Sequence, residues 1–127
     1  MRERPNALLV DDNPQVLMTL GLLFQAMGWN TSKAEHSEQA MPLLLEQNFD
    51  LAILDLKMPD VSGIELCRMI RSKNKLNPSV IFILSGHVTP QARAEAESAG
   101  VQAILNKPIG LNEMKAVLEK FGLPCGT

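Results

Sequence analysis

The chain has 127 residues, of which 46% are hydrophobic and 20% are charged, and its formal net charge is −2. This length and composition are typical of one soluble globular domain with a core of its own. The nearly neutral charge balance gives no reason to expect direct binding to nucleic acid. We therefore expect a single domain over residues 1–127, with its core at about 6–122 and a tail or the start of a linker at 123–127.

The sequence carries no signal for a membrane or for secretion. No apolar stretch is long enough to span a bilayer, and the charged start MRERPN lacks the apolar centre of a signal peptide. Cys67 and Cys125 stand apart, outside the spacings of metal sites. Isolated cysteines suit a reducing compartment, so we expect a cytoplasmic protein without membrane contact.

Short apolar runs closed by turn residues alternate along the chain with segments of helical periodicity. The expected strands are residues 7–10, 29–34, 50–54, 80–84 and 101–105. The expected helices begin at Asn13-Pro14, Ser37, Ser62-Gly63, Thr89-Pro90 and Leu111. Pro42 lies one turn inside the second of these helices, where it should kink the helix or delay its start.

The alternation predicts an α/β fold, namely a flavodoxin-like, doubly wound sheet of five parallel strands in the order 2-1-3-4-5 with five helices. In the first helix, helical spacing assigns a core face to five apolar residues: Val16, Leu20, Leu23, Phe24 and Met27. Met18 and Leu22 fall on the opposite side of that helix. The fourth helix is rich in alanine, so we expect it to bury little apolar area and to be the least firmly anchored.

Polar residues follow four strands at the edge where the carboxyl ends of a parallel sheet meet. They are Asp11 and Asp12, then Asp55, Ser85 and Lys107. Three carboxylates in one small site repel each other unless a cation is present, and a hard divalent ion such as Mg²⁺ prefers oxygen ligands. A lysine and a hydroxyl beside such a metal are the groups that stabilise a phosphoryl group. Asp55 is then a candidate nucleophile that would form an acyl phosphate.

Each of these residues taken alone also has an ordinary structural explanation. An acid pair before a helix can serve as a cap, an Asp or Ser-Gly after a strand can form a turn, and a lysine is usually solvated. The chemical interpretation is favoured because all of them fall at the same end of four strands that the topology places side by side.

The ordered set of motifs resembles the receiver domain of two-component response regulators over residues 6 to about 122. The matching motifs are Asp11-Asp12, the segment Asp55-Leu56-Lys57-Met58-Pro59-Asp60 with Gly63, Ser85-Gly86 and Lys107-Pro108. The resemblance implies a signalling switch and not a turnover enzyme. It also implies a partner, either a sensor histidine kinase or a histidine phosphotransfer protein, whose phosphohistidine would supply the phosphoryl group.

The resemblance assigns a role to each matching residue. Asp55 would accept the phosphoryl group, Ser85 would hydrogen-bond it and Lys107 would pair with one of its oxygens. Mg²⁺ would be bound by Asp11, Asp12 and Asp55 together with the backbone carbonyl of Lys57. The Lys107-Pro108 peptide bond would be cis. Lys57 and His87 would flank the site and tune the lifetime of the phosphoryl group.

One departure from the family pattern concerns the readout of phosphorylation. An aromatic residue usually stands three positions before the lysine, and here that position is Ile104. The resemblance implies that phosphorylation changes the surface around the fourth helix, fifth strand and fifth helix. The sequence leaves the output open: it is compatible with an output domain, linked or separate, and with a homodimer on activation. A second hypothesis concerns Met18 and Leu22. Because the first helix of such domains docks against the phosphoryl donor, we expect these two residues to contribute to that docking.

Two other functions stay open on the sequence alone. The first is a phosphorylation-independent interaction module with the same fold, which Ile104 favours and the intact acids and Lys107 oppose. The second is a small Mg²⁺-dependent phosphatase with an Asp nucleophile. Such an enzyme usually has a second acid two residues after the nucleophile, where this chain has Lys57.

Overall fold

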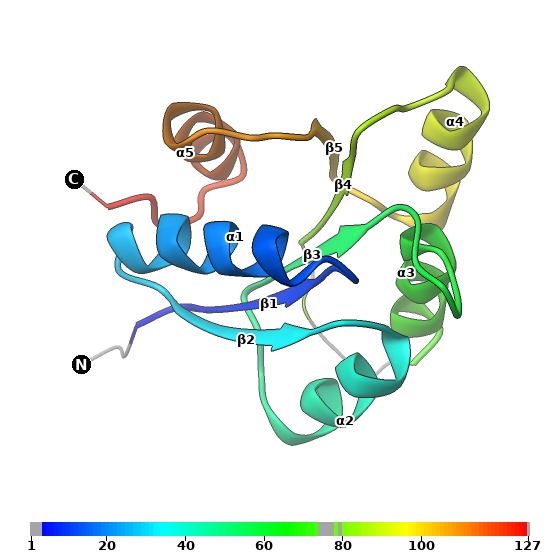
Figure 1. The fold of residues 1–127 in the computed structure, drawn as a ribbon, viewed down its shortest axis with the longest axis horizontal. Helices are drawn as coiled ribbons and strands as arrows, with labels where there is room; N and C mark the ends of the chain where they lie inside the picture. Colours follow the sequence, from blue (N-terminus) through cyan, green and yellow to red (C-terminus); the bar gives the residue numbers. More distant parts are fainter. Residues whose placement is uncertain (1–3, 74–77, 79, 127) are drawn as a thin grey trace.

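The structure is a computed structural model, and it describes residues 4–73, 78 and 80–126. In this part of the chain five strands alternate with five helices (Figure 1). The strands are β1 (Asn6–Val10), β2 (Asn30–Ala34), β3 (Leu51–Asp55), β4 (Ile81–Ser85) and β5 (Ala103–Asn106). The helices are α1 (Pro14–Ala26), α2 (Ser37–Glu46), α3 (Gly63–Arg71), α4 (Pro90–Ala99) and α5 (Leu111–Lys120).

The strands form one sheet in the order β2-β1-β3-β4-β5, and every neighbouring pair is parallel. The predicted doubly wound α/β fold is therefore confirmed. Side chains of α2, α3 and α4 form a core on one face of the sheet, and those of α1 and α5 form a second core on the other face. Figure 1 shows the same division, with α1 and α5 on one side of the strands and α3 and α4 on the other.

Three strands, β3, β4 and β5, extend one residue past their apolar runs, and two of them end in a buried polar residue. Asp55 and Ser85 are the last residues of β3 and β4, and they lie in register with Leu84 and Asn106 respectively. The sequence predicts that both strands end one residue earlier, because a polar side chain after an apolar run is read as a turn. Both polar residues are instead buried with the strand, at 5% and 4% exposure.

The core face of α1 differs from the predicted one. Leu17, which the spacing argument omitted, is buried together with Leu20 and Phe24, whereas Val16 and Leu23 are only partly buried. Helix α1 packs on the sheet along one side and contributes Val16 and Leu23 to the edge of the core that it shares with α5. Because α1 faces both the sheet and α5, its apolar side chains cover a wider arc of the helix surface than the single core-facing stripe predicted from the spacing.

Helix α2 runs through Pro42, and the proline does not delay the start of the helix at Ser37. Helix α4 buries only Ala96 and Ala99 among its residues, as its alanine-rich sequence predicts. Within the described residues, no helix is long and apolar enough to cross a membrane. Both cysteines are free thiols, with Cys67 buried and Cys125 partly buried.

The side chain of Arg71 links the end of α3 to the turn between α4 and β5. Its guanidinium donates to the carbonyl oxygens of Pro78 at 2.7 Å and Gly100 at 2.9 Å, and to Gln102 Oε1 at 2.9 Å. The same Gln102 oxygen accepts the backbone N–H of Ile81 at 2.8 Å, which extends the network to β4. Gly100 has φ of 93°, a left-handed conformation that glycine adopts without the strain of a side chain. Arg71 thus joins α3, the α4–β5 turn and β4 through one guanidinium.

We expect Arg71→Met to lower the free energy of unfolding by about 2 kcal/mol, because it leaves partly buried carbonyl groups without a charged donor. Arg68→Met is the matched control on the same helix, since Arg68 makes an exposed ion pair with Glu65 at 3.1 Å. Loss of that exposed pair should cost less than ~0.5 kcal/mol. Urea unfolding followed by circular dichroism measures both values, and equal effects of the two substitutions would contradict the role of Arg71.

Candidate functional site

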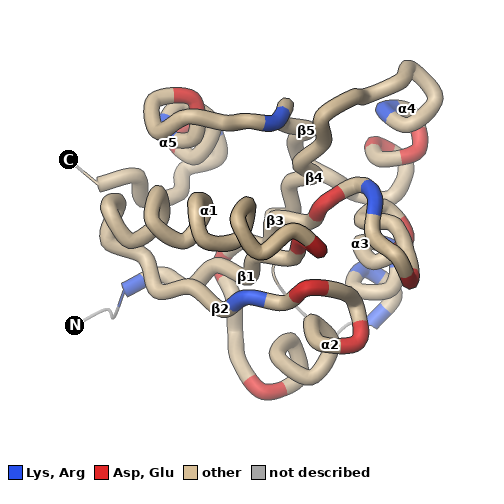
Figure 2. The backbone as a smooth tube through the Cα atoms, in the orientation of Figure 1, with Lys and Arg blue, Asp and Glu red and all other residues tan. Residues whose placement is uncertain are grey.

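Four strand ends bring polar residues together at the carboxyl edge of the sheet, as predicted. Asp11 and Asp12 directly follow β1, Asp55 ends β3, and Ser85 ends β4 beside Asn106 of β5. The carboxylate groups of Asp11, Asp12 and Asp55 each offer an oxygen, and these oxygens lie within 4.8 Å of one another. Figure 2 shows acidic segments gathered where β1 and β3 end, below a basic segment that precedes α5.

Lys107 lies between two of these acids. Its Nζ is 3.0 Å from Asp55 Oδ1 and 2.9 Å from Asp11 Oδ2. The backbone N–H of Lys107 donates to the carbonyl oxygen of Ser85 at 2.8 Å, which holds the chain after β5 beside the end of β4. The Lys107-Pro108 peptide bond is cis, so this expectation is confirmed.

Burial and the contacts between Lys107 and the carboxylates shift the pKa values of the site in opposite directions. Burial raises the pKa of the Asp55 carboxyl and the Asp11 charge adds to this effect, while the hydrogen bond from Lys107 lowers it; the net result is a raised pKa. Burial lowers the pKa of Lys107, but its contacts with Asp11 and Asp55 outweigh burial, so the pKa of Lys107 is raised. The site therefore favours the protonated form of Lys107 and disfavours the ionised form of Asp55. An additional cation would stabilise the ionised carboxylates.

Asp11 supplies a direct test of whether a metal ion suits this site. Its carboxylate is 1% exposed, and Oδ1 accepts the backbone N–H of Asn13 at 2.9 Å. Oδ2 makes no hydrogen bond within the described residues, although the Lys107 ammonium is at ion-pair distance. The ammonium that meets this buried oxygen is shared with Asp55, so the site retains excess negative charge that a further cation would offset. Together with Asp12 and Asp55, Asp11 forms an oxygen-only set of ligands, which fits Mg²⁺.

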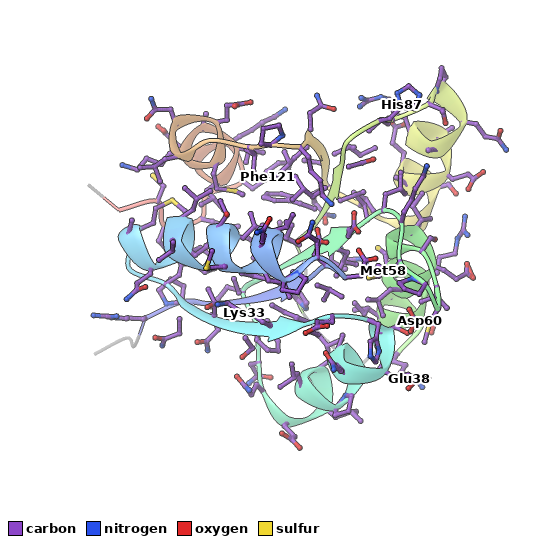
Figure 3. The ribbon with its side chains drawn as sticks, viewed as in Figure 1. Lys33, Glu38, Met58, Asp60, His87 and Phe121 are labelled. Atoms are coloured by element: carbon purple, nitrogen blue, oxygen red, sulfur yellow. The ribbon has the colours of Figure 1, made fainter. Side chains whose placement is uncertain are left out.

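The hydroxyl of Ser85 is engaged within its own loop. Ser85 Oγ donates to the carbonyl oxygen of His87 at 2.8 Å and accepts the backbone N–H of His87 at 3.2 Å. The side chains of His87 and Lys57 are exposed, and Figure 3 places His87 on the connection between β4 and α4. No contact described here tests the roles that the sequence analysis gave to the Lys57 carbonyl, to Ser85 or to His87.

Gly63 allows α3 to approach the end of β3 closely. A Cβ atom at this position would lie 2.3 Å from the backbone oxygen of Asp55, so a side chain there would force the backbone apart. The N–H of Gly63 donates to the carbonyl oxygen of Leu56 at 3.0 Å. The sequence placed Gly63 at the start of the third helix and in the family motif, but its close approach to Asp55 was not predicted. The available signal was a glycine at the first helical position, where proline is more usual, eight residues after a strand-end acid.

The sequence matches the family model described as the response regulator receiver domain over residues 7–119. It is 30% identical to the chemotaxis protein CheY of Pseudomonas aeruginosa, over 90% of this chain and 93% of that protein. It is 38% identical to stress response regulator protein 1 of Debaryomyces hansenii over 82% of this chain, and it spans 44% of that longer protein.

A solved structure extends the likeness to three dimensions. The response regulator protein TrrA of Thermotoga maritima, in complex with Mg²⁺-BeF, is 30% identical to this chain and has a TM-score of 0.78. The superposition covers 91% of this chain and 97% of that one. The family match, the sheet order and the acidic cluster agree with one another. This chain belongs to the family of response regulator receiver domains.

Proposed function

We propose that this chain is a phosphoacceptor switch, in which Asp55 takes a phosphoryl group from a phosphohistidine on a sensor histidine kinase or a histidine phosphotransfer protein. One observation carries the proposal: the carboxylates of Asp11, Asp12 and Asp55 converge within 4.8 Å, with the Lys107 ammonium 3.0 Å from Asp55. The protein would act in the cytoplasm as a switch and would not turn over a metabolite. We propose that residues 1–127 form one receiver domain.

In the transfer, a carboxylate oxygen of Asp55 attacks the phosphorus atom of the donor. The new O–P bond forms as the N–P bond of the phosphohistidine breaks, and the electron pair of that bond stays on the imidazole nitrogen, which is then protonated. Lys107, already beside Asp55 Oδ1, neutralises negative charge on a phosphoryl oxygen. Ser85 exchanges its hydrogen bond to the His87 carbonyl for one to a second phosphoryl oxygen.

Mg²⁺ is the cofactor that we propose for this reaction, and when bound it supplies positive charge beside the phosphoryl oxygens. Asp11, Asp12, Asp55 and the backbone carbonyl of Lys57 would hold it. The support for this assignment is the oxygen-only donor set and the buried Asp11 Oδ2, which has no hydrogen-bond partner in the described part of the chain. The Mg²⁺-BeF complex of the Thermotoga relative is consistent with it.

The output surface that we propose comprises α4, β5 and α5. Ile104 of β5 is partly buried and packs at the edge of the α2–α3–α4 core, in the place where the family's aromatic residue would stand. Because Ile104 has no ring to swing inward, we infer that the movement of Ser85 is passed on mainly through the β4–α4 connection and α4. A linked or separate output domain, or a second copy of this chain, would then bind the altered surface.

The central test is phosphorylation by a small donor. With Mg²⁺ and acetyl phosphate, the wild-type chain should gain one phosphoryl group per molecule by intact-protein mass spectrometry, and Asp55→Asn should gain none. Glu65→Gln, an exposed acid on α3 outside the site, should be modified as the wild type is.

Other outcomes of this experiment favour other functions. No modification of the wild-type chain, with beryllofluoride also failing to bind, would support the phosphorylation-independent module. Sustained release of phosphate from a metabolite would support the Asp-nucleophile phosphatase.

The proposed metal site makes a prediction about stability. Mg²⁺ at about 100 times its Kd should stabilise the wild-type chain by ~2.7 kcal/mol, and Asp12→Asn should lose most of this gain. Without Mg²⁺, Asp12→Asn should be at least as stable as the wild type, because it removes one of three converging negative charges. Thermal unfolding with and without Mg²⁺ measures both effects. Glu119→Gln on α5 is the control, and an equal Mg²⁺ response in Asp12→Asn would argue against the site.

Met18 and Leu22 are exposed at 55% and 60%, as the helical spacing predicts, and we propose that they contribute to docking of the phosphoryl donor. Replacing both by Ser should slow transfer from the cognate kinase several-fold while labelling by acetyl phosphate is unchanged, since the acids are untouched. Leu45→Ser on α2 is the matched control, because Leu45 is also a large exposed apolar residue, at 72%. Equal loss of both activities in the double variant would contradict the docking role.

A further inference from the structure

The segment between β3 and α3, residues 56–62, contains Lys57, whose backbone carbonyl is one of the proposed metal ligands. The N–H of Leu56 donates to the Leu84 carbonyl oxygen, which ties the start of the segment to β4. The N–H of Gly63 donates to the Leu56 carbonyl oxygen, which ties the residue after the segment back to its start; both distances are 3.0 Å. The middle of the segment reaches a different element. There the carboxylate of Asp60 contacts Ser37, the first residue of α2.

This contact is a helix cap supplied by a distant part of the chain. The backbone N–H of Ser37 donates to Asp60 Oδ2 at 3.1 Å, and the Ser37 hydroxyl donates to the same oxygen. Residue His36 occupies the cap position of α2 but makes no side-chain cap hydrogen bond. A helix N-terminus is stabilised by an oxygen acceptor, and by a negative charge most of all. Asp60 therefore fills a requirement of α2 that the helix's own sequence leaves unmet.

The burial of Ser37 and the ionisation of Asp60 both favour the hydrogen bonds between them. Ser37 is 6% exposed, so its hydroxyl is largely removed from competing water. The hydrogen bond from Ser37 is the largest cause that lowers the pKa of the Asp60 carboxyl, which keeps the carboxylate ionised. Figure 3 shows Asp60 on the same side of the molecule as Glu38, the neighbour of Ser37 in α2.

The covalent chain connects this cap to the metal site over a short distance. Only Met58 and Pro59 separate Lys57 from Asp60, and the pyrrolidine ring of Pro59 fixes its φ angle. At the other end, Gly63 is pressed against the Asp55 carbonyl, where a Cβ would lie 2.3 Å away. Lys57 lies between two anchored residues, because Leu56 is hydrogen-bonded to Leu84 of β4 and Asp60 is hydrogen-bonded to Ser37 of α2. Its peptide therefore has little freedom to rotate.

We propose that Asp60 is a positioning residue for the metal site: by capping α2 it holds the Lys57 carbonyl toward Asp55 and the acid pair. The inference rests on the proposed function, because the ligand role of Lys57 belongs to that proposal. It adds that the turn between β2 and α2 supports the site although it contributes no ligand. Groups that orient metal ligands typically affect affinity by roughly 10- to 100-fold.

The test is a Mg²⁺ titration of the full chain, followed by NMR shifts of backbone amides, with the Kd of each variant compared. Asp60→Ala should weaken Mg²⁺ binding by roughly tenfold, the lower end for supporting groups. Asp60→Asn keeps an oxygen acceptor for Ser37 and should lie between the wild type and Asp60→Ala. Glu38→Gln removes one negative charge beside Ser37 without touching the cap, and should change the Kd by less than about twofold because an exposed charge is screened.

Urea unfolding without Mg²⁺ separates positioning from a purely structural role. If Asp60→Ala lowers the free energy of unfolding while its Mg²⁺ Kd equals that of Glu38→Gln, Asp60 is only a cap and the inference is wrong. If Asp60→Ala does not fold, the same comparison is made with Asp60→Asn, whose Kd must then exceed that of Glu38→Gln. A wild-type chain that binds no Mg²⁺ would overturn the proposed metal site itself, and with it this inference.

Discussion

The Lys107 ammonium, shared by Asp11 and Asp55, is the interaction on which the rest of the site depends. A parallel sheet necessarily brings its strand ends to one edge, and here that edge carries three carboxylates within 4.8 Å. One ammonium cannot balance three carboxylates: two negative charges are left over, which equals the charge of one Mg²⁺. The bond between the Lys107 N–H and the Ser85 carbonyl oxygen anchors the chain that carries the ammonium, so the cation is held there by the sheet itself.

Local patterns, namely apolar runs that end in polar residues, predicted the alternation of strands and helices. The sheet order was predicted as the common doubly wound arrangement for that alternation, and the convergence of the acids follows from it. Local patterns failed where a second neighbour or a distant contact decides the structure. Leu17 was omitted from the α1 core face because the helix packs against both the sheet and α5. The contact between Ser37 and Asp60 joins residues 23 positions apart and leaves no signature in either segment. Gly63 was placed at the start of the third helix, but its close approach to the Asp55 backbone depends on how α3 packs against β3, which local sequence does not reveal.

Helices α3 and α4 share one core but bury unequal amounts of apolar side chain in it. Helix α3 buries four apolar side chains, Ile64, Leu66, Cys67 and Ile70, whereas α4 buries two alanines. Two polar contacts join α3 to the last turn of α4: Cys67 Sγ contacts the Ala99 carbonyl oxygen, and Arg71 donates to that of Gly100. The start of α4, which follows the Ser85 loop, is thus held less than its end. A helix fixed at one end can change its direction at modest cost in buried area.

Trp29 is the one tryptophan of the chain, and it lies at the end of α1 remote from the acids. Its ring is 2% exposed and meets Phe24 edge to face at 5.2 Å, while its indole N–H donates to the Pro124 carbonyl oxygen at 2.8 Å. Helix α1 has 13 residues between the two regions, a length of roughly 20 Å at 1.5 Å per residue. Because the chain has no tyrosine, its intrinsic fluorescence comes mainly from this one indole, which is packed against α1 and the tail and lies the length of α1 away from the acids.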